Sequence, residues 1–314
     1  MQTGQQAVIL GAGSIGLSFA AVFADAGFAV TVAEPDATRR DAALAEVAAQ
    51  QHAIALAGLT MGKGGHVTCL PDATPALATA DLVIEAGPER LDVKQAIFAV
   101  LLSQAPQAIL ATASSAIPMS RIVPNPADQA RCLVAHPVNP PAVLRLIELV
   151  PALNTSASTL VMARTLFTAA GFESVTLGHE IEGFVLNRLQ GAVLREAYRL
   201  VQDGVVDVAG LDRVMRLGLG PRWALSGPFE TAELNTPGGI VAHAARMGPA
   251  YRAMGEARGE VGCDWPKDLI ASVDAQRRAV IAVQELPDRV AWRAQAVARL
   301  VALRDTLIGA KDDR

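Results

Sequence analysis

The stretch AVILGAGSIG, residues 7–16, decides the fold of the first half of the chain. It opens with a short apolar run typical of a buried strand, which leads directly into a match to G-x-G-x-x-G. In that pattern the first glycine allows a tight turn, the second lets the backbone approach a pyrophosphate, and the third lets helix and strand pack closely. The phosphates of a dinucleotide would bind at the N-terminus of the following helix, where backbone N–H groups are free. The expected phosphate-binding residues are Gly11, Ala12, Gly13, Ser14, Ile15 and Gly16.

An acidic residue stands where a dinucleotide site needs one. Glu34 follows a second predicted strand, Ala29–Ala33, and lies 18 residues after Gly16. A carboxylate at this place accepts hydrogen bonds from the adenosine ribose and repels a 2′-phosphate, so the sequence predicts NAD rather than NADP as the cofactor. Arg39 and Arg40 lie close by and would weaken that preference. We interpret both as solvated charges in the first turns of a helix.

Short apolar runs alternate with helical patterns through residues 7–177, which predicts a parallel sheet covered by helices on both faces. Helices are expected after the glycine motif and over about 91–102 and 156–170. The further predicted strands are Leu82–Glu85, Ala108–Ala111, Cys132–Ala135, Leu146–Leu149 and Ser174–Leu177. After residue 182 the pattern is mostly helical and starts with a long helix over about 184–202. We therefore expect an α/β fold: a Rossmann-type doubly wound, mostly parallel sheet over residues 1–182, with a second all-α domain over 183–314.

Composition excludes several classes of protein. Hydrophobic residues make up 51% of the chain and charged residues 18%, so the chain can bury a large core and is not disordered. The net charge of −4, with no basic block, argues against a nucleic-acid partner, and no apolar run has the length of a membrane span. Cys69, Cys132 and Cys263 form no metal-ligand pattern and no disulfide framework, which favours a cytoplasmic setting without a metal. The stretch MQTGQQAVIL lacks a basic start and a long apolar run, so we expect no signal peptide.

Residues 132–151, CLVAHPVNPPAVLRLIELVP, place a histidine and a glutamate in two strand-like runs joined by a proline-rich turn. His136 and Glu148 are 12 residues apart, so a hairpin would bring their side chains together. An imidazole takes the proton from an alcohol as hydride leaves the carbon, and a buried carboxylate fixes its tautomer and stabilises the imidazolium. Spacing alone leaves another interpretation open, a satisfied core histidine beside a glutamate at the end of a strand.

The segments AHPVNPP, residues 135–141, and IELVP, residues 147–151, resemble the HxxNP signature of the 3-hydroxyacyl-CoA dehydrogenase family. They are most similar to the branch of λ-crystallin and L-gulonate 3-dehydrogenase. The resemblance implies that His136 and Glu148 are the catalytic dyad and that Asn139 helps to position the site. EGFVLNRLQGAVLRE, residues 182–196, resembles the helix that opens the second domain of this family, which is helical and forms dimers. It implies that Asn187 hydrogen-bonds the reacting oxygen.

Two further segments resemble the same family. Ser114 and Ser115 resemble its paired serines, which implies that Ser114 contacts substrate. PERLDVK, residues 88–94, resembles the segment that supplies Glu89 and Lys94 to the nicotinamide ribose side. Without the resemblance, the serines would be read as a turn and the two charges as solvated helix residues. The resemblance spans nearly the full length, including residues 218–230 and 292–304.

The class of substrate follows from a departure and a candidate cation. Members of the family that use coenzyme A resemble one another in a lysine-bearing helical hairpin, but residues 38–66 here are short, rich in alanine and glycine, and carry only Lys63. That favours a free acid, and Arg222, beside Trp223, is the candidate for its carboxylate. A structural salt bridge at Arg222 stays open, and so does a cation–π site at Trp223 for carnitine.

The leading hypothesis is an NAD-dependent oxidoreductase that acts on a short L-3-hydroxy acid, with L-gulonate as the first candidate and a cytoplasmic homodimer as its form. The alternatives are a 3-hydroxyacyl-CoA or carnitine dehydrogenase, and a non-catalytic NAD-binding structural protein. The presence of all four expected catalytic positions argues against a structural protein, because a decayed site would be expected to lose at least one. These positions are His136, Glu148, Ser114 and Asn187.

Overall fold

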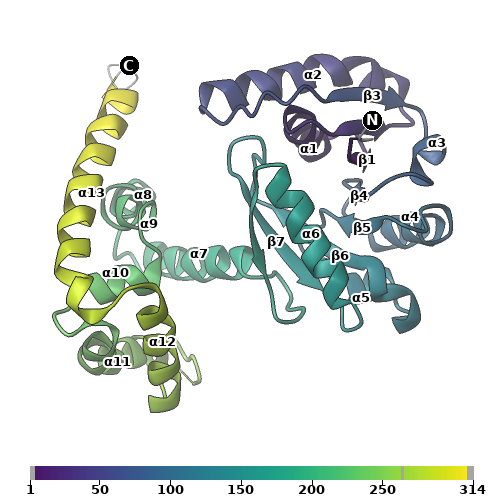
Figure 1. Cartoon of the computed structure of the whole chain (residues 1–314). Helices are drawn as coiled ribbons and strands as arrows, with labels where there is room; N and C mark the ends of the chain where they lie inside the picture. The colour runs from purple at the N-terminus through teal and green to yellow at the C-terminus, as the bar shows by residue number, and fades with distance from the viewer. Residues whose placement is uncertain (1–3, 263–264, 310–314) are drawn as a thin grey trace. The chain divides into compact units, whose positions relative to one another are not determined.

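A computed structural model describes residues 4–262 and 265–309 (Figure 1). The chain divides into two compact units, residues 1–194 and 195–314. One of the three cysteines considered above, Cys263, lies outside the described residues.

The first unit is built on one eight-stranded sheet with the strand order β3-β2-β1-β4-β5-β6-β7-β8. All neighbouring strands are parallel except β6 and β7, which form an antiparallel pair. The chain crosses from one half of the sheet to the other between β3 and β4, which creates the switch point where doubly wound sheets bind ligands. The strands are β1 (Gln6–Leu10), β2 (Ala29–Ala33), β3 (His66–Leu70), β4 (Leu82–Glu85), β5 (Ile109–Thr112), β6 (Cys132–Pro137), β7 (Leu146–Pro151) and β8 (Glu173–Thr176).

Helices cover both faces of the sheet because the strands are apolar on both sides. In β1, Ile9 packs into one core and Val8 into the other, and in β4 Ile84 and Val83 divide in the same way. The first core also takes Phe19, Phe23 and Phe167 from the helices on its face, and the second takes Phe98 and Leu101 from the other face. The helices are α1 (Ser14–Asp25), α2 (Ala37–Leu56), α3 (Thr74–Leu77), α4 (Leu91–Gln104), α5 (Met119–Ile122), the 3-10 turn η1 (Pro126–Arg131) and α6 (Ala157–Ala169).

The predicted fold class is confirmed, and most predicted elements of the first unit lie within a few residues of the observed ones. The extent of α2 and the whole of β3 were not predicted from the sequence. Residues 37–56 form one helix whose only buried residues are Ala43, Val47 and Ile54, so its apolar pattern is weak. Strand β3 is an edge strand with an exposed or half-buried pattern, and it lacks the continuous apolar run that marks the central strands.

The second unit is helical over its described residues. Helix α7 (Leu186–Gln202) runs from the first unit into it. The elements that follow are α8 (Val208–Val214), the π-helical turn η2 (Met215–Leu219), α9 (Gly220–Trp223), α10 (Pro228–Leu234), α11 (Gly239–Ala257), α12 (Lys267–Val280), the 3-10 turn η3 (Val283–Glu285) and α13 (Leu286–Gly309). None of the described helices combines the length and the apolar character needed to cross a membrane.

Candidate active site

The glycine loop between β1 and α1 has the geometry that a pyrophosphate requires. Gly11 adopts a left-handed φ of 106° and its N–H donates to Ala33 O at 2.8 Å, which closes the tight turn. A Cβ added at Gly13 would meet no heavy atom within 4 Å, so the backbone there is open to a ligand. Gly13 caps α1 without any side-chain hydrogen bond, and the first N–H groups of the helix stay available for phosphate oxygens. The loop therefore fits NAD.

Glu34 is buried directly beside this loop. Its Oε2 accepts from Ala12 N at 2.9 Å and its Oε1 accepts from Asp36 N at 3.0 Å. The carboxylate thus ties the end of β2 to the glycine loop and keeps lone pairs for ribose hydroxyls. Arg40 donates through Nη1 to the backbone oxygens of Glu34 and Pro35, so its guanidinium is bound to the chain beside the predicted ribose site.

The antiparallel pairing of β6 and β7 places the expected dyad together. His136 lies directly opposite Glu148 in the strand register, and His136 Nδ1 is 2.7 Å from Glu148 Oε2. Both side chains are buried, at 5% and 4% exposure. Because an ionised carboxylate only accepts hydrogen bonds, Nδ1 carries the proton and Nε2 is left as the basic nitrogen.

Glu148 also receives the start of α7. Its Oε1 accepts from Val185 N and Leu186 N, both at 3.0 Å. Burial acts to raise the pKa of Glu148, but the hydrogen bonds from His136 and from these two amides lower it by a larger amount. The pKa of Glu148 therefore lies below its ordinary value. The carboxylate therefore stays ionised, which is the state that is able to stabilise an imidazolium.

Phe184 packs against the dyad, a contact that was not predicted from the sequence. Its ring centroid lies 5.3 Å from that of His136, and the side chain is fully buried. Its backbone has a φ of 51°, a conformation that non-glycine residues seldom adopt and that functional sites often contain. An aromatic residue after a glycine carries no sequence signal for this role. The Phe184 ring packs against the imidazole at a tilt of 53°.

The other expected residues of the first unit divide between buried and exposed positions. Ser114 is fully buried, and its hydroxyl donates to Glu89 Oε1 at 2.6 Å. Asn187 donates through Nδ2 to Ser115 O at 2.9 Å. Asn139 is exposed and precedes a cis peptide bond to Pro140. In the part of the chain that the structure describes, no hydrogen bond joins the Asn139 side chain to the dyad.

Lys94 is buried. The sequence pattern alone, without the family resemblance, had suggested a solvated charge on a helix. Its Nζ pairs with Glu85 Oε2 at 2.8 Å, and this ion pair is almost entirely screened from solvent. Glu85 also accepts from Thr112 Oγ1 at 2.6 Å and Gly87 N at 2.8 Å. Glu85 and Thr112 carry no sequence signal for a role, because Glu85 ends one predicted apolar strand and Thr112 directly follows another.

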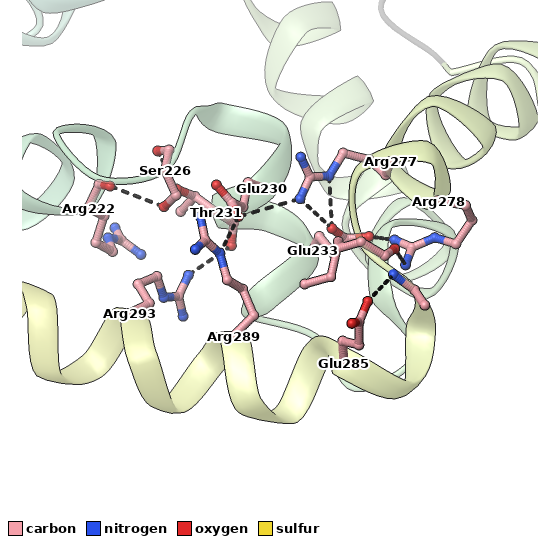
Figure 2. Close-up of polar contacts among 12 residues, drawn as sticks. Arg222, Ser226, Glu230, Thr231, Glu233, Arg277, Arg278, Glu285, Arg289 and Arg293 are labelled. Carbon is pink, nitrogen blue, oxygen red and sulfur yellow. Dashed lines mark hydrogen bonds and ion pairs between the residues drawn. The ribbon is translucent and has the colours of Figure 1, made fainter.

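Arg222 lies in the second unit, on the short helix α9. Its Nε donates to Gly218 O at 3.2 Å, and among the described residues it forms no ion pair with a carboxylate. Burial lowers the pKa of Arg293 (Figure 2), the positive charge of Arg222 lowers it further, and the negative charge of Glu230 acts in the opposite direction. Arg222 and Trp223 line a mostly apolar cavity of about 430 Å³. The cavity therefore combines apolar walls with a guanidinium that forms no ion pair among the described residues.

Among residues 4–262 and 265–309, no group of three or more histidine, cysteine, aspartate or glutamate side chains could hold a metal ion. The chemistry available is that of a nucleotide-binding loop beside a histidine–carboxylate pair. Fold and site define an NAD-dependent dehydrogenase that acts on a CH–OH group.

Residues 6–181 match the NAD-binding domain of 3-hydroxyacyl-CoA dehydrogenase, and residues 183–281 match the C-terminal domain of the same family. The chain belongs to the 3-hydroxyacyl-CoA dehydrogenase family, which confirms the resemblance found in the sequence.

Curated relatives cover most of the chain. A λ-crystallin homologue of Bos taurus is 35% identical over 311 residues, with 95% of each chain covered. An L-carnitine dehydrogenase of Streptomyces coelicolor is 34% identical over 249 residues, with 78% of each covered. Among solved structures, a 5-dehydrogenase of 5-formyl-3-hydroxy-2-methylpyridine 4-carboxylic acid has a TM-score of 0.72 at 23% identity, covering 93% of this chain and 98% of its own. At that identity the structure shows the shared fold.

Proposed function

We propose that the protein oxidises the 3-hydroxyl carbon of a short L-3-hydroxy acid, with His136 as the base. The observation that carries this proposal is the His136 Nδ1–Glu148 Oε2 contact of 2.7 Å, which leaves Nε2 as the proton acceptor. Bound NAD supplies the hydride acceptor. As the hydride leaves, Nε2 of His136 takes the hydroxyl proton, and the ionised Glu148 stabilises the resulting imidazolium. Asn187 is the proposed donor to the oxygen that becomes a carbonyl.

The proposed substrate is a free acid, with L-gulonate as the first candidate. Arg222 lacks a carboxylate partner among the described residues, so its guanidinium is free to pair with the carboxylate of a substrate. A carboxylate that enters a partly desolvated site needs a paired cation. The alternative substrates are carnitine, through a cation–π contact with Trp223, and a coenzyme A thioester. The relatives named above include both a λ-crystallin homologue and a carnitine dehydrogenase.

NADH formation measured with a panel of 3-hydroxy acids, their thioesters and carnitine tests this proposal. Arg222→Met should lower kcat/KM for the free acid by about one to two orders of magnitude, since a charged hydrogen bond contributes about 1.5–3 kcal/mol. The thioester should lose far less. Arg216→Met, an exposed arginine on the preceding turn, is the matched control. A parent enzyme that prefers the thioester, or equal losses for both substrates, would refute the proposed substrate class.

We also propose a cytoplasmic homodimer formed by the second unit. Large apolar side chains there are exposed, among them Tyr198, Val241, Met254 and Leu269. Contiguous exposed apolar surface often marks a protein interface. A monomeric mass in light scattering at micromolar concentration would contradict the dimer. Activity on any member of the substrate panel would exclude the remaining alternative, a non-catalytic NAD-binding protein.

A further inference from the structure

Phe184 belongs to the apolar core that lies against the strands of the dyad. Its side chain is fully buried, and the same core contains Val134 of β6 and Val150 of β7. Val134 and Val150 face each other in the strand register. Because side chains alternate along a strand, the next pair on the same face is the dyad, His136 and Glu148. The phenyl ring therefore packs where the apolar core ends and the dyad begins.

The ring of Phe184 contacts the imidazole of His136 itself. The two ring centroids are 5.3 Å apart, and the ring planes are inclined by 53°. The hydrogen bond from Nδ1 to Glu148 defines the place of one ring nitrogen, but rotation about that bond still moves Nε2. Contact with a second buried ring limits this rotation, because side chains in a close-packed interior have few alternative positions. Nε2 is the atom that the proposed mechanism uses as the base.

The backbone at Phe184 serves the other member of the dyad. Gly183 and Phe184 have left-handed φ values of 75° and 51°, so the chain turns sharply just before α7. After this turn, the N–H groups of Val185 and Leu186 both donate to Glu148 Oε1. One turn thus delivers a ring to the histidine and two hydrogen bonds to the carboxylate.

Phenylalanine is an unfavourable residue for this backbone conformation. In the left-handed region Cβ lies close to the following carbonyl oxygen, so glycine is the usual residue there. A glycine at this position would allow the same turn and the same two hydrogen bonds without strain, but it would lack the ring. The strained backbone therefore indicates that the side chain of Phe184 has a role, and the aromatic group that it contacts among the described residues is His136.

We propose that Phe184 is a positioning residue for the base: its ring holds the imidazole of His136 so that Nε2 keeps one orientation toward the substrate hydroxyl. The inference rests on the proposed function for the role of His136. Loss of the ring should slow the transfer of the proton and the hydride. It should leave NAD binding unchanged, because the glycine loop and Glu34 hold the dinucleotide.

Two substitutions separate the ring from the backbone. Phe184→Ala removes the ring and keeps a Cβ in the left-handed region, whereas Phe184→Gly removes the ring and relieves the strain. Both should lower kcat by about 10- to 100-fold with little change in KM, since a misplacement of about 1 Å at the reacting atoms costs up to about 10²-fold. The urea midpoint of Phe184→Gly should equal or exceed that of Phe184→Ala. Phe184→Leu, which restores an apolar side chain in the same space, should recover much of the lost kcat.

Phe167→Ala is the matched control. Phe167 is also fully buried, but it lies on α6 in the other core of the first unit, and its described ring contacts are with other phenylalanines. Its loss leaves a cavity of the same kind and should lower the urea midpoint as the loss of Phe184 does. Folded Phe167→Ala should nevertheless keep the kcat of the parent, because its cavity is not next to the imidazole.

A spectroscopic measurement on His136 needs no substrate. The Nδ1 proton, hydrogen-bonded to the buried Glu148, should give a far-downfield signal in proton NMR, which is assigned by its absence in His136→Ala. In Phe184→Gly the signal should broaden or disappear, because the imidazole moves and water reaches the pair. Phe167→Ala should retain it. A parent that shows the signal but oxidises no 3-hydroxy acid would refute the proposed function and leave the contact between Phe184 and the imidazole open to the same NMR test.

The kcat of the parent in folded Phe184→Gly would overturn the proposal, and so would an unchanged downfield signal in that variant. A loss of kcat in Phe184→Ala that Phe184→Gly restores would assign the effect to the backbone and not to the ring. Activity that falls only in proportion to the unfolded fraction, as expected for Phe167→Ala, would make Phe184 a structural residue. If Phe184→Ala fails to fold, Phe184→Gly and Phe184→Leu still provide the test, and a leucine variant no more active than the glycine variant would contradict positioning by packing.

Discussion

Both units of the molecule bury a carboxylate among positive or proton-donating groups, but the two arrangements differ in what they leave free. In the first unit, Glu148 accepts from His136 and from two backbone amides, and the histidine keeps a basic nitrogen. In the second unit, the fully buried Glu233 is enclosed by Arg277 and Arg278 (Figure 2). No titratable nitrogen remains there, because guanidinium groups do not release protons in proteins.

The comparison shows that burial and pairing alone do not make a catalytic site. The Glu233 cluster joins α10 to α12, and the neighbouring Glu230 joins α10 to Arg289 of α13. It is a structural network that ties α10 to α12 and α13. The His136–Glu148 pair spans two adjacent strands whose register the sheet already fixes.

Removal of the proposed base, His136, should have the largest effect of the substitutions considered. His136→Ala should lower kcat by about 10²–10⁴-fold, because it removes the general base. NAD binding should stay unchanged, since the glycine loop and Glu34 hold the dinucleotide. Initial rates together with NADH titration check both parts. Turnover within a few-fold of the parent would show that another group takes the proton.

Removal of the buried carboxylate of the second unit, Glu233, should have a smaller effect, and on stability. Glu233→Ala removes the buried carboxylate that pairs with the half-buried Arg277 and Arg278, which should lower the free energy of unfolding by about 3–5 kcal/mol. Asp274→Asn is the control, because Asp274 is a partly exposed partner of Arg278, and exposed pairs contribute about 0–1 kcal/mol. Urea titration measures both variants. If Glu233→Ala raised KM or lowered kcat in protein shown to be folded, the cluster would belong to the active site.

A smaller effect concerns the cofactor choice. Glu34→Gln should weaken NAD by about tenfold and narrow its advantage over NADP, because the carboxylate loses a charged hydrogen bond to the ribose and no longer repels a 2′-phosphate. Asp41→Asn, an exposed acid on α2, serves as the control. Titration of both cofactors decides the matter, and a parent that binds NADP more tightly would contradict the assignment of Glu34.

The smallest expected effect is on how the stability of the protein depends on pH. The pKa of Glu148 is lower in the folded protein than in the unfolded chain, so its contribution to stability is present above about pH 4.3, the ordinary glutamate pKa. That contribution is lost as the pH falls through the lower folded-state pKa. Glu148→Gln should therefore flatten the acid limb of the stability curve, whereas Glu46→Gln, an exposed carboxylate on α2, should not. An unchanged acid limb in Glu148→Gln would show that the pair does not stabilise the fold.

Sequence alone determined the parts of this protein that depend on local spacing. The glycine motif after an apolar run predicted the turn and the start of α1, and the 12 residues between His136 and Glu148, with prolines between them, predicted a hairpin that pairs the two side chains. Each of these features is a property of one continuous stretch, and its outcome depends on backbone sterics and strand register.

Which charged side chains are buried, and which groups they bind, depends on the tertiary structure. Glu89 lies in the turn before α4 and Lys94 lies five residues later, in the first turn of that helix. Lys94 is nevertheless buried against the sheet, whereas Glu89 is exposed. That difference depends on Glu85 and Thr112, which two separate strands bring beneath the helix. The ring of Phe184 reaches His136 for the same kind of reason, since the fold brings together segments 48 residues apart. The free energy of a charge depends on its whole surroundings, which no single stretch of sequence contains.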